Sequence, residues 1–165
     1  MKLLKRIGLA LLVVLAGLQF IPTRSNQTKE VTSSPDFIKI NKVPDDMGRI
    51  LLTSCYNCHS NNTNYPWYSR VQPVGWFLGN HISKGKAELN FSEFGSYSVR
   101  KQISKLKLMV TQIEKNEMPI ASYTFIHREA RLSKGSKKAI VDYLSELQNS
   151  LQNEQTGFTK KIEVQ

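Results

Sequence analysis

The sequence predicts an all-α domain of about four to five short helices behind an apolar N-terminal segment. Apolar residues recur at spacings of three and four in the segments 44–58, 98–117 and 133–151, which is the helical period. No strand–helix–strand pattern is visible, so nothing indicates a parallel sheet. The 165 residues suit one small domain with tails, and an apolar content of 40% allows a single modest core.

Changes in composition divide the chain into four regions. We expect a signal peptide or N-terminal membrane anchor at 1–22, a linker or extended arm at 23–42, the folded domain at 43–152 and a disordered tail at 153–165.

The N-terminal region has a basic head, with Lys2, Lys5 and Arg6, followed by an apolar stretch at 7–21. This order is typical of a secretion signal or a signal anchor. The stretch is shorter than the about 20 residues that a confident membrane span needs. No A-x-A cleavage site follows it, so the sequence favours a retained anchor, with a cleaved signal peptide as the alternative.

The first helix of the domain is expected from Pro44 to about Cys58, because proline and the acids after it suit a first turn. Residues that recur on its inward face are Met47, Ile50, Leu51, Ser54, Cys55 and Cys58.

This helix ends in the C-x-x-C-H run Cys55-Tyr56-Asn57-Cys58-His59, which contains the only two cysteines of the chain. C-x-x-C-H is the signature of c-type haem attachment: each thiol adds to a vinyl group and the histidine binds iron. A zinc site or a redox dithiol are the alternatives. A structural zinc site needs four ligands, and His81 and His127 lie too far apart in sequence to supply an H-x(3–5)-H pair.

A loop is expected at 60–68, followed by a short helix from about Pro73 to Lys84 that ends at Gly85. Four aromatic residues in this part could form the wall of a haem pocket, or could fill the core beneath the loop. They are Tyr65, Trp67, Tyr68 and Trp76.

A turn at 90–96 precedes the clearest helix, 98–117, in which Met109 is expected in the core. Met118 follows, and we expect it to be the second axial ligand, because a thioether suits haem iron and Pro119 stiffens the loop. His81 and His127 are the alternative ligands, and a core methionine at a helix end is the plainer interpretation of Met118. A last helix is expected from Ser133 or Ser136 to Leu151.

The net charge of +10 indicates what kind of partner the protein could bind. Part of it lies in the N-terminal region, and the rest of the chain is mildly basic. This balance favours an acidic redox partner or an anionic membrane surface. No basic run interleaved with aromatic residues argues for nucleic acid.

Several short runs of the sequence belong together. They are Cys55–His59 with Ser60-Asn61, Tyr65-Pro66-Trp67-Tyr68, Pro73-Val74-Gly75-Trp76, Asn90-Phe91-Ser92, Met118-Pro119 and His127–Leu132. With these runs the chain resembles the bacterial haem-binding domain family, a set of small exported c-type haem proteins that are similar to cytochrome c. The resemblance covers about 43–147 and implies one covalent haem c on Cys55 and Cys58, with His59 as the proximal ligand.

The expected function is single-electron transfer by a haem in an all-α, cytochrome c-like bundle, and not catalysis, since Met118 would close the sixth position on iron. An enzyme or sensor with an open distal site for peroxide or a gas is the alternative, and a zinc or dithiol module without haem is the third. We expect the protein on the periplasmic side of a bacterial inner membrane, anchored or secreted, where it would serve a redox partner protein.

Overall fold

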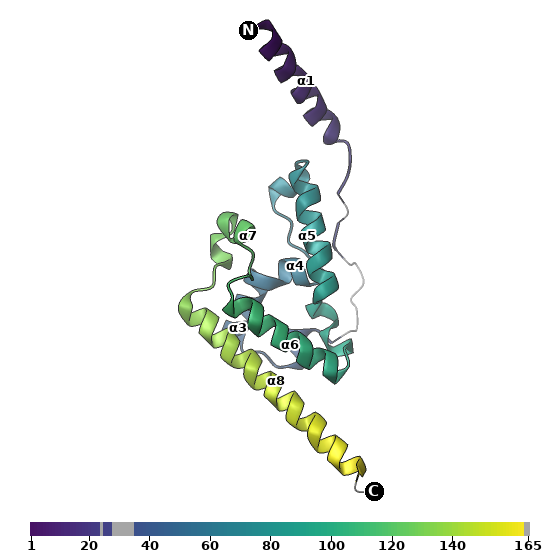
Figure 1. Ribbon diagram of the computed structural model, residues 1–165, viewed down its shortest axis with the longest axis vertical. Helices are drawn as coiled ribbons and strands as arrows, with labels where there is room; N and C mark the ends of the chain where they lie inside the picture. Colours follow the sequence, from purple (N-terminus) through teal and green to yellow (C-terminus); the bar gives the residue numbers. More distant parts are fainter. Residues whose placement is uncertain (24, 28–34, 164–165) are drawn as a thin grey trace.

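The computed structural model describes residues 1–23, 25–27 and 35–163, and none of these forms a strand (Figure 1). The all-α class is confirmed, although the helices are shorter and more numerous than the expected four to five. The α-helices are α1 (Lys2–Leu18), α2 (Phe37–Ile40), α3 (Asp45–Leu51), α4 (Asn57–His59), α5 (Val74–Glu88), α6 (Val99–Glu114), α7 (Ala121–Ile126) and α8 (Lys134–Glu163). The other helical turns are η1 (Leu52–Tyr56), η2 (Trp67–Arg70), η3 (Phe91–Ser96) and η4 (Arg128–Ala130).

The first predicted helix is present as the succession of α3, η1 and α4, which begins after Pro44 and ends at His59. Its middle segment, η1, is a π-helix, and such turns are often found at functional sites. The chain turns out of the helix at Ser60, whose backbone is extended. The cysteine pair therefore lies at the end of an early helix, as the sequence predicts.

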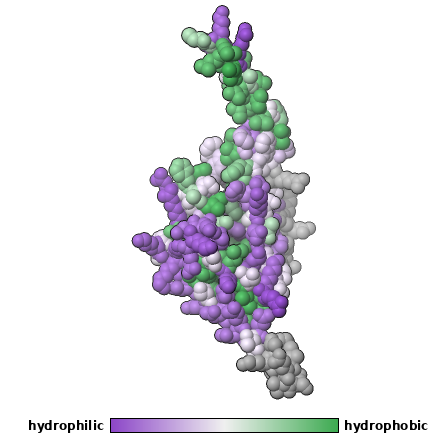
Figure 2. Space-filling model, viewed as in Figure 1, coloured by the Kyte–Doolittle hydropathy of each residue, from purple (hydrophilic) through white to green (hydrophobic). Residues whose placement is uncertain are grey.

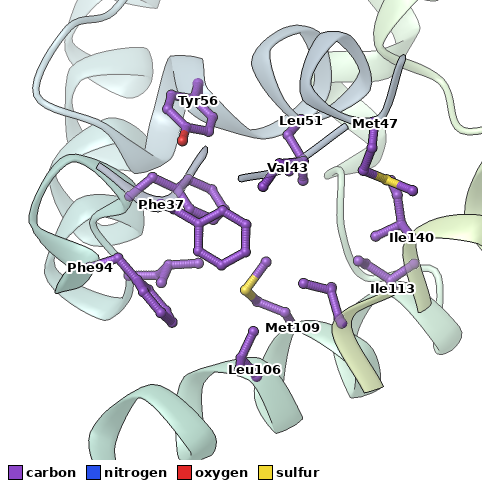
Figure 3. Close-up of a cluster of buried hydrophobic side chains, with 13 residues drawn as sticks. Phe37, Val43, Met47, Leu51, Tyr56, Phe94, Leu106, Met109, Ile113 and Ile140 are labelled. Carbon is purple, nitrogen blue, oxygen red and sulfur yellow. The ribbon is translucent and has the colours of Figure 1, made fainter. Parts of the chain in front are cut away.

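The core lies where α2, α3, η3, α6 and α8 meet, and Figure 3 shows its side chains converging. Phe37 is its centre: the ring is fully buried and packs edge-on against Phe91 and Phe94, with centroids 5.3 and 4.9 Å away. The remaining core residues are Val43, Met47, Leu51, Tyr56, Leu89, Leu106, Met109, Ile113, Ile140 and Leu144.

Phe37 comes from the region expected to be a linker or extended arm. Around it the chain is helical, because the Asp36 side chain accepts a hydrogen bond from the Ile38 N–H (2.9 Å) and starts α2. Most of the remaining arm, residues 28–34, lies outside the described residues. The described end of the expected arm is thus attached to the domain by the buried Phe37 side chain.

Helices α6 and α8 pack along each other beneath this core. Met109 is buried as expected, whereas Val99, an apolar residue at the start of α6, is 41% exposed. Helix α8 continues to Glu163, so the predicted end at Leu151 is wrong, and the described part of the expected tail is helical. The segment after Leu151 has no proline and is rich in glutamine, glutamate and lysine, which sustain a helix.

Helix α5 also runs past its predicted end, because Gly85 does not stop it and the helix continues to Glu88. Gly85 instead allows α5 to pack closely against the cysteine segment. A Cβ at this position would lie 3.1 Å from the Cys58 carbonyl oxygen and 3.3 Å from Cε1 of His59. Helix α5 can approach the cysteine segment only because this residue has no side chain.

Helix α1 projects away from the domain and has no buried residue (Figure 1). Its surface is apolar except at its first turns (Figure 2). The described part of the chain contains no helix that is both long enough and apolar enough to cross a membrane.

Candidate functional site

Two neighbouring cavities, of about 300 and 280 Å³, lie beside the cysteine segment. Cys55, His59 and Met118 line both of them. The larger cavity continues between α6, Phe91 and Leu132, and the smaller one between α5 and α7. The fold therefore brings Met118 to the cysteine segment from a distant part of the chain.

His59 is held in a defined orientation and tautomer. Its Nδ1 lies 3.2 Å from the Leu89 carbonyl oxygen, which can only accept, so Nδ1 carries the proton and Nε2 keeps a free lone pair. The Phe91 ring meets the imidazole edge-on, with centroids 6.2 Å apart. Burial lowers the pKa of His59 and favours the neutral imidazole, which is the form that binds a metal ion.

The two thiols are free and partly buried, and Cys55 packs against the core. Burial, with a smaller contribution from neighbouring Cys58, raises the pKa of Cys55 to about 12. Burial also raises the pKa of Cys58. Both groups are therefore protonated at neutral pH, unlike the low-pKa thiolates of redox dithiols. Among the described residues, no three His, Cys, Asp or Glu side chains are grouped to hold a metal ion.

The end of α6 directs Met118 toward the cavities. Asn116 takes a left-handed conformation (φ 57°), which reverses the chain after Lys115. The Asn116 N–H donates to the Ile113 carbonyl (3.1 Å) and the Glu117 N–H to the Gln112 carbonyl (2.9 Å), which is the pattern of a Schellman cap. Met118 follows within two residues and reaches both cavities.

The two alternative ligands have different surroundings. His81 lines only the smaller cavity, where its ring packs on Phe77 with centroids 4.4 Å apart. His127 lines neither cavity, because both its nitrogens are engaged. Its Nε2 lies 2.7 Å from the Tyr68 hydroxyl and its Nδ1 3.1 Å from Oε1 of Glu129.

None of the four predicted wall aromatics lines either cavity. The Tyr65 hydroxyl accepts a hydrogen bond from the Asn26 N–H (2.7 Å), Trp67 is 80% exposed, and Tyr68 contacts His127. Trp76 lines a separate cavity of about 740 Å³. The reason is that the 60–68 loop packs against residues 25–27, where Gln27 pairs with Asn62, and not over His59.

Other residues support the site without having been predicted. The Asn57 amide, between the two cysteines, donates to the Tyr123 hydroxyl (2.8 Å) and accepts from the Asn64 N–H (3.0 Å). Phe91 and Leu89 hold His59 from η3 and the end of α5. Two signals in the sequence could have pointed to this support. Phe91 belongs to one of the runs that carry the family resemblance, and Gly85 is a glycine inside a helical pattern, which often marks close packing.

Comparison with known proteins gives one result. A family model described as a haem-binding domain matches residues 13–146. No curated protein and no solved structure matches the chain.

Proposed function

Because the chain belongs to the haem-binding domain family, we propose that it carries one haem c, bonded to Cys55 and Cys58 and ligated by His59. The observation that carries this proposal is the convergence of Cys55, His59 and Met118 on the same two cavities. The haem-binding character follows from the family. The covalent attachment, the single haem and the ligands are our proposal.

The residues present fit such a group. Two protonated thiols can add to vinyl groups, and His59 presents the free lone pair of its Nε2. Leu108, Met109 and Ile113 give the larger cavity an apolar wall that excludes water. Lys84 and Lys105 line the smaller and larger cavities and could pair with carboxylates at the edge of the group.

We propose further that the protein is a single-electron carrier. Haem iron supplies one-electron chemistry between iron(II) and iron(III). Met118 would hold the iron together with His59. A methionine with a histidine would raise the reduction potential relative to two histidines and would leave no site for a small molecule. The protein's part is to hold the ring, exclude water and fix the two ligands.

The setting that we propose is the periplasmic side of a bacterial inner membrane, with a redox protein as partner. Helix α1 supports attachment to a membrane, since its apolar side chains contact no other part of the described chain closely enough to be buried.

The attachment is tested by expressing the full chain with haem-attachment machinery. We expect a haem stain that survives denaturing electrophoresis, one haem per chain by alkaline pyridine spectroscopy, and loss of the stain in the Cys55→Ala, Cys58→Ala double variant. A colourless mature protein, or a haem removed by denaturation, would contradict the covalent attachment.

The carrier assignment is tested separately by optical spectroscopy of the oxidised and reduced protein. We expect a methionine-to-iron(III) charge-transfer band that Met118→Ala abolishes and His81→Ala preserves. The Met118→Ala protein should become high-spin and bind carbon monoxide. If the unaltered protein is already high-spin and binds carbon monoxide, the haem enzyme or sensor is the better assignment.

A further inference from the structure

Four large apolar side chains on η2, α5 and α7 are exposed, and we call this group the apolar rim. They are Trp67 of η2 (80% exposed), Phe77 of α5 (59%), and Phe125 and Ile126 of α7 (77% and 57%). Exposed apolar residues are common singly, but a group of large ones marks an interaction surface.

Ring contacts and one hydrogen bond link Trp67 and Phe77 to residues that line the smaller cavity. The Trp67 ring packs edge-on against Tyr68 (5.9 Å between centroids), and the Tyr68 hydroxyl lies 2.7 Å from Nε2 of His127. His127 stacks on Tyr123 (4.5 Å), which belongs to the same helix as Phe125. Tyr123 lines the smaller cavity, as does His81, on which Phe77 packs. Two of the four rim residues are therefore linked to the lining of the smaller cavity, and the other two lie on the helix that contributes Tyr123 to that lining.

Helix α1 leaves the domain beside the rim. The Gln19 amide donates to the Gln72 carbonyl (3.2 Å), and its oxygen accepts from the Gln72 N–H (2.9 Å). Gln72 lies between Trp67 and Phe77 in the chain. Figure 1 shows the start of α5 and α7 in the half of the domain that is nearer α1, with α6 and α8 farther from it.

The apolar composition of α1 indicates which environment surrounds the end of the domain from which α1 projects. Leucine, isoleucine and valine side chains are exposed on all its sides, and a helix that is apolar all round belongs in an apolar environment such as lipid. Lys2 and Lys5 stand in its first turns.

The charges around the rim complement an anionic surface. Arg70 follows Trp67 in η2, and Arg128 and Arg131 follow α7, all three with exposed side chains. Glu129 is an acid among them. Tryptophan beside arginine is a combination that suits the headgroup region of a bilayer that contains anionic lipids.

We propose that the apolar rim rests on the surface of an anionic lipid bilayer beside the point where α1 enters it, so that the smaller cavity faces the headgroups. This goes beyond haem binding and does not depend on which residue is the distal ligand. It depends on α1 entering lipid, which the same experiment measures.

The test uses the full-length haem-loaded protein in vesicles of phosphatidylethanolamine and phosphatidylglycerol that contain a lipid with a diazirine on its headgroup. After illumination, lipid adducts are mapped by peptide mass spectrometry. We expect adducts at 67–77 and 121–126 in addition to α1. Leu52 of η1 and Val99 of α6, which are 50% and 41% exposed and line neither cavity, serve as internal controls and should carry none.

Two double variants make the result specific. Trp67→Gln with Phe125→Gln should lose the adducts at the rim but keep those in α1 and the haem spectrum, whereas Leu52→Gln with Val99→Gln, at two positions that line neither cavity, should change nothing. Adducts confined to α1, or labelling of Leu52 and Val99 as strong as that of the rim, would each overturn the proposal. A missing haem spectrum would count against the proposed function alone.

Discussion

At the scale of single residues, three neighbours set the position and orientation of the His59 ring. Its Nδ1 donates to the Leu89 carbonyl, Phe91 packs against its ring, and Gly85 leaves room beside Cε1. A hydrogen bond from Nδ1 to a backbone carbonyl fixes the orientation of a metal-binding histidine and increases the basicity of its other nitrogen. In the proposed haem site, His59 would thus be oriented by residues that do not themselves bind iron.

The space beside Gly85 can be tested by Gly85→Ala. Alanine in place of glycine within a helix usually gains about 0.5–1 kcal/mol. Here we expect no gain and a net loss, together with a changed absorption spectrum, because the new Cβ would press on Cys58 and His59. The matched control is Gly48→Ala in α3, where the nearest atoms would be 4.0 Å away and the usual gain is expected. Chemical denaturation measures both, and equal gains would contradict the packing role.

Protonation of His59 should couple to folding in the chain before haem attachment. Burial lowers its pKa from the ordinary value of 6.5, so below that pH the unfolded chain binds a proton that the folded chain does not. We therefore expect the free energy of unfolding of the Cys55→Ser, Cys58→Ser variant to fall as the pH drops below about 6.5, and to be independent of this group above it.

This dependence is measured by urea denaturation between about pH 5.5 and 7.5, a range above most carboxylate titration. Adding His59→Gln should flatten the profile. A profile that keeps its slope after this substitution would assign the effect to other groups.

At the scale of elements, the join between α6 and the Met118 loop depends on a cap and on a lysine from another helix. Nζ of Lys137 in α8 donates to the Glu114 carbonyl and to Oδ1 of Asn116, each at 2.8 Å. The same asparagine thus turns the chain and fastens the turn to α8. The position of Met118 is therefore set partly by α8, which contributes no residue to either cavity.

We expect Asn116→Val to destabilise the protein by about 1–2 kcal/mol, because a β-branched residue is strained in the left-handed conformation. It should also weaken the methionine-to-iron charge-transfer band, since Met118 lies two residues away. Asn116→Gly keeps the conformation and loses only the contact with Lys137, so it should change both less. Thermal unfolding and the oxidised spectrum report the two effects, and a Val variant as stable as the Gly variant would contradict this account.

At the scale of the whole molecule, the part of the apolar core between α6 and α8 and the smaller cavity are built by different elements. Helices α6 and α8 bury Leu106, Ile140 and Leu144 fully on the side away from the smaller cavity. The cysteine segment, α5 and α7 enclose that cavity. Stability and ligand binding can therefore be perturbed separately.

We expect Leu144→Ala to lower the free energy of unfolding by about 2–5 kcal/mol, because it leaves a cavity in a fully buried position. Its haem spectrum should not change, since Leu144 lines neither cavity. Leu108→Ala, at a 40% exposed position of α6 that lines the larger cavity, should cost much less stability. Denaturation of the haem-loaded proteins checks this, and a Leu144→Ala protein with an altered axial ligand would contradict the separation.

Three features follow from local sequence alone: the all-α class, the start of the first helix after Pro44 and the C-x-x-C-H run at its end. They depend on the helical period, on the residues of the first helical turn and on a motif of five adjacent residues. All three are patterns within a short stretch of sequence. Only the tertiary structure decided that Met118 and His81 reach the cavities while His127 and the four aromatic residues do not, and that Gly85 packs where it was expected to end a helix. Those outcomes depend on which distant segments pack together, here the 60–68 loop on residues 25–27 and α8 on the end of α6, and no local pattern encodes that choice.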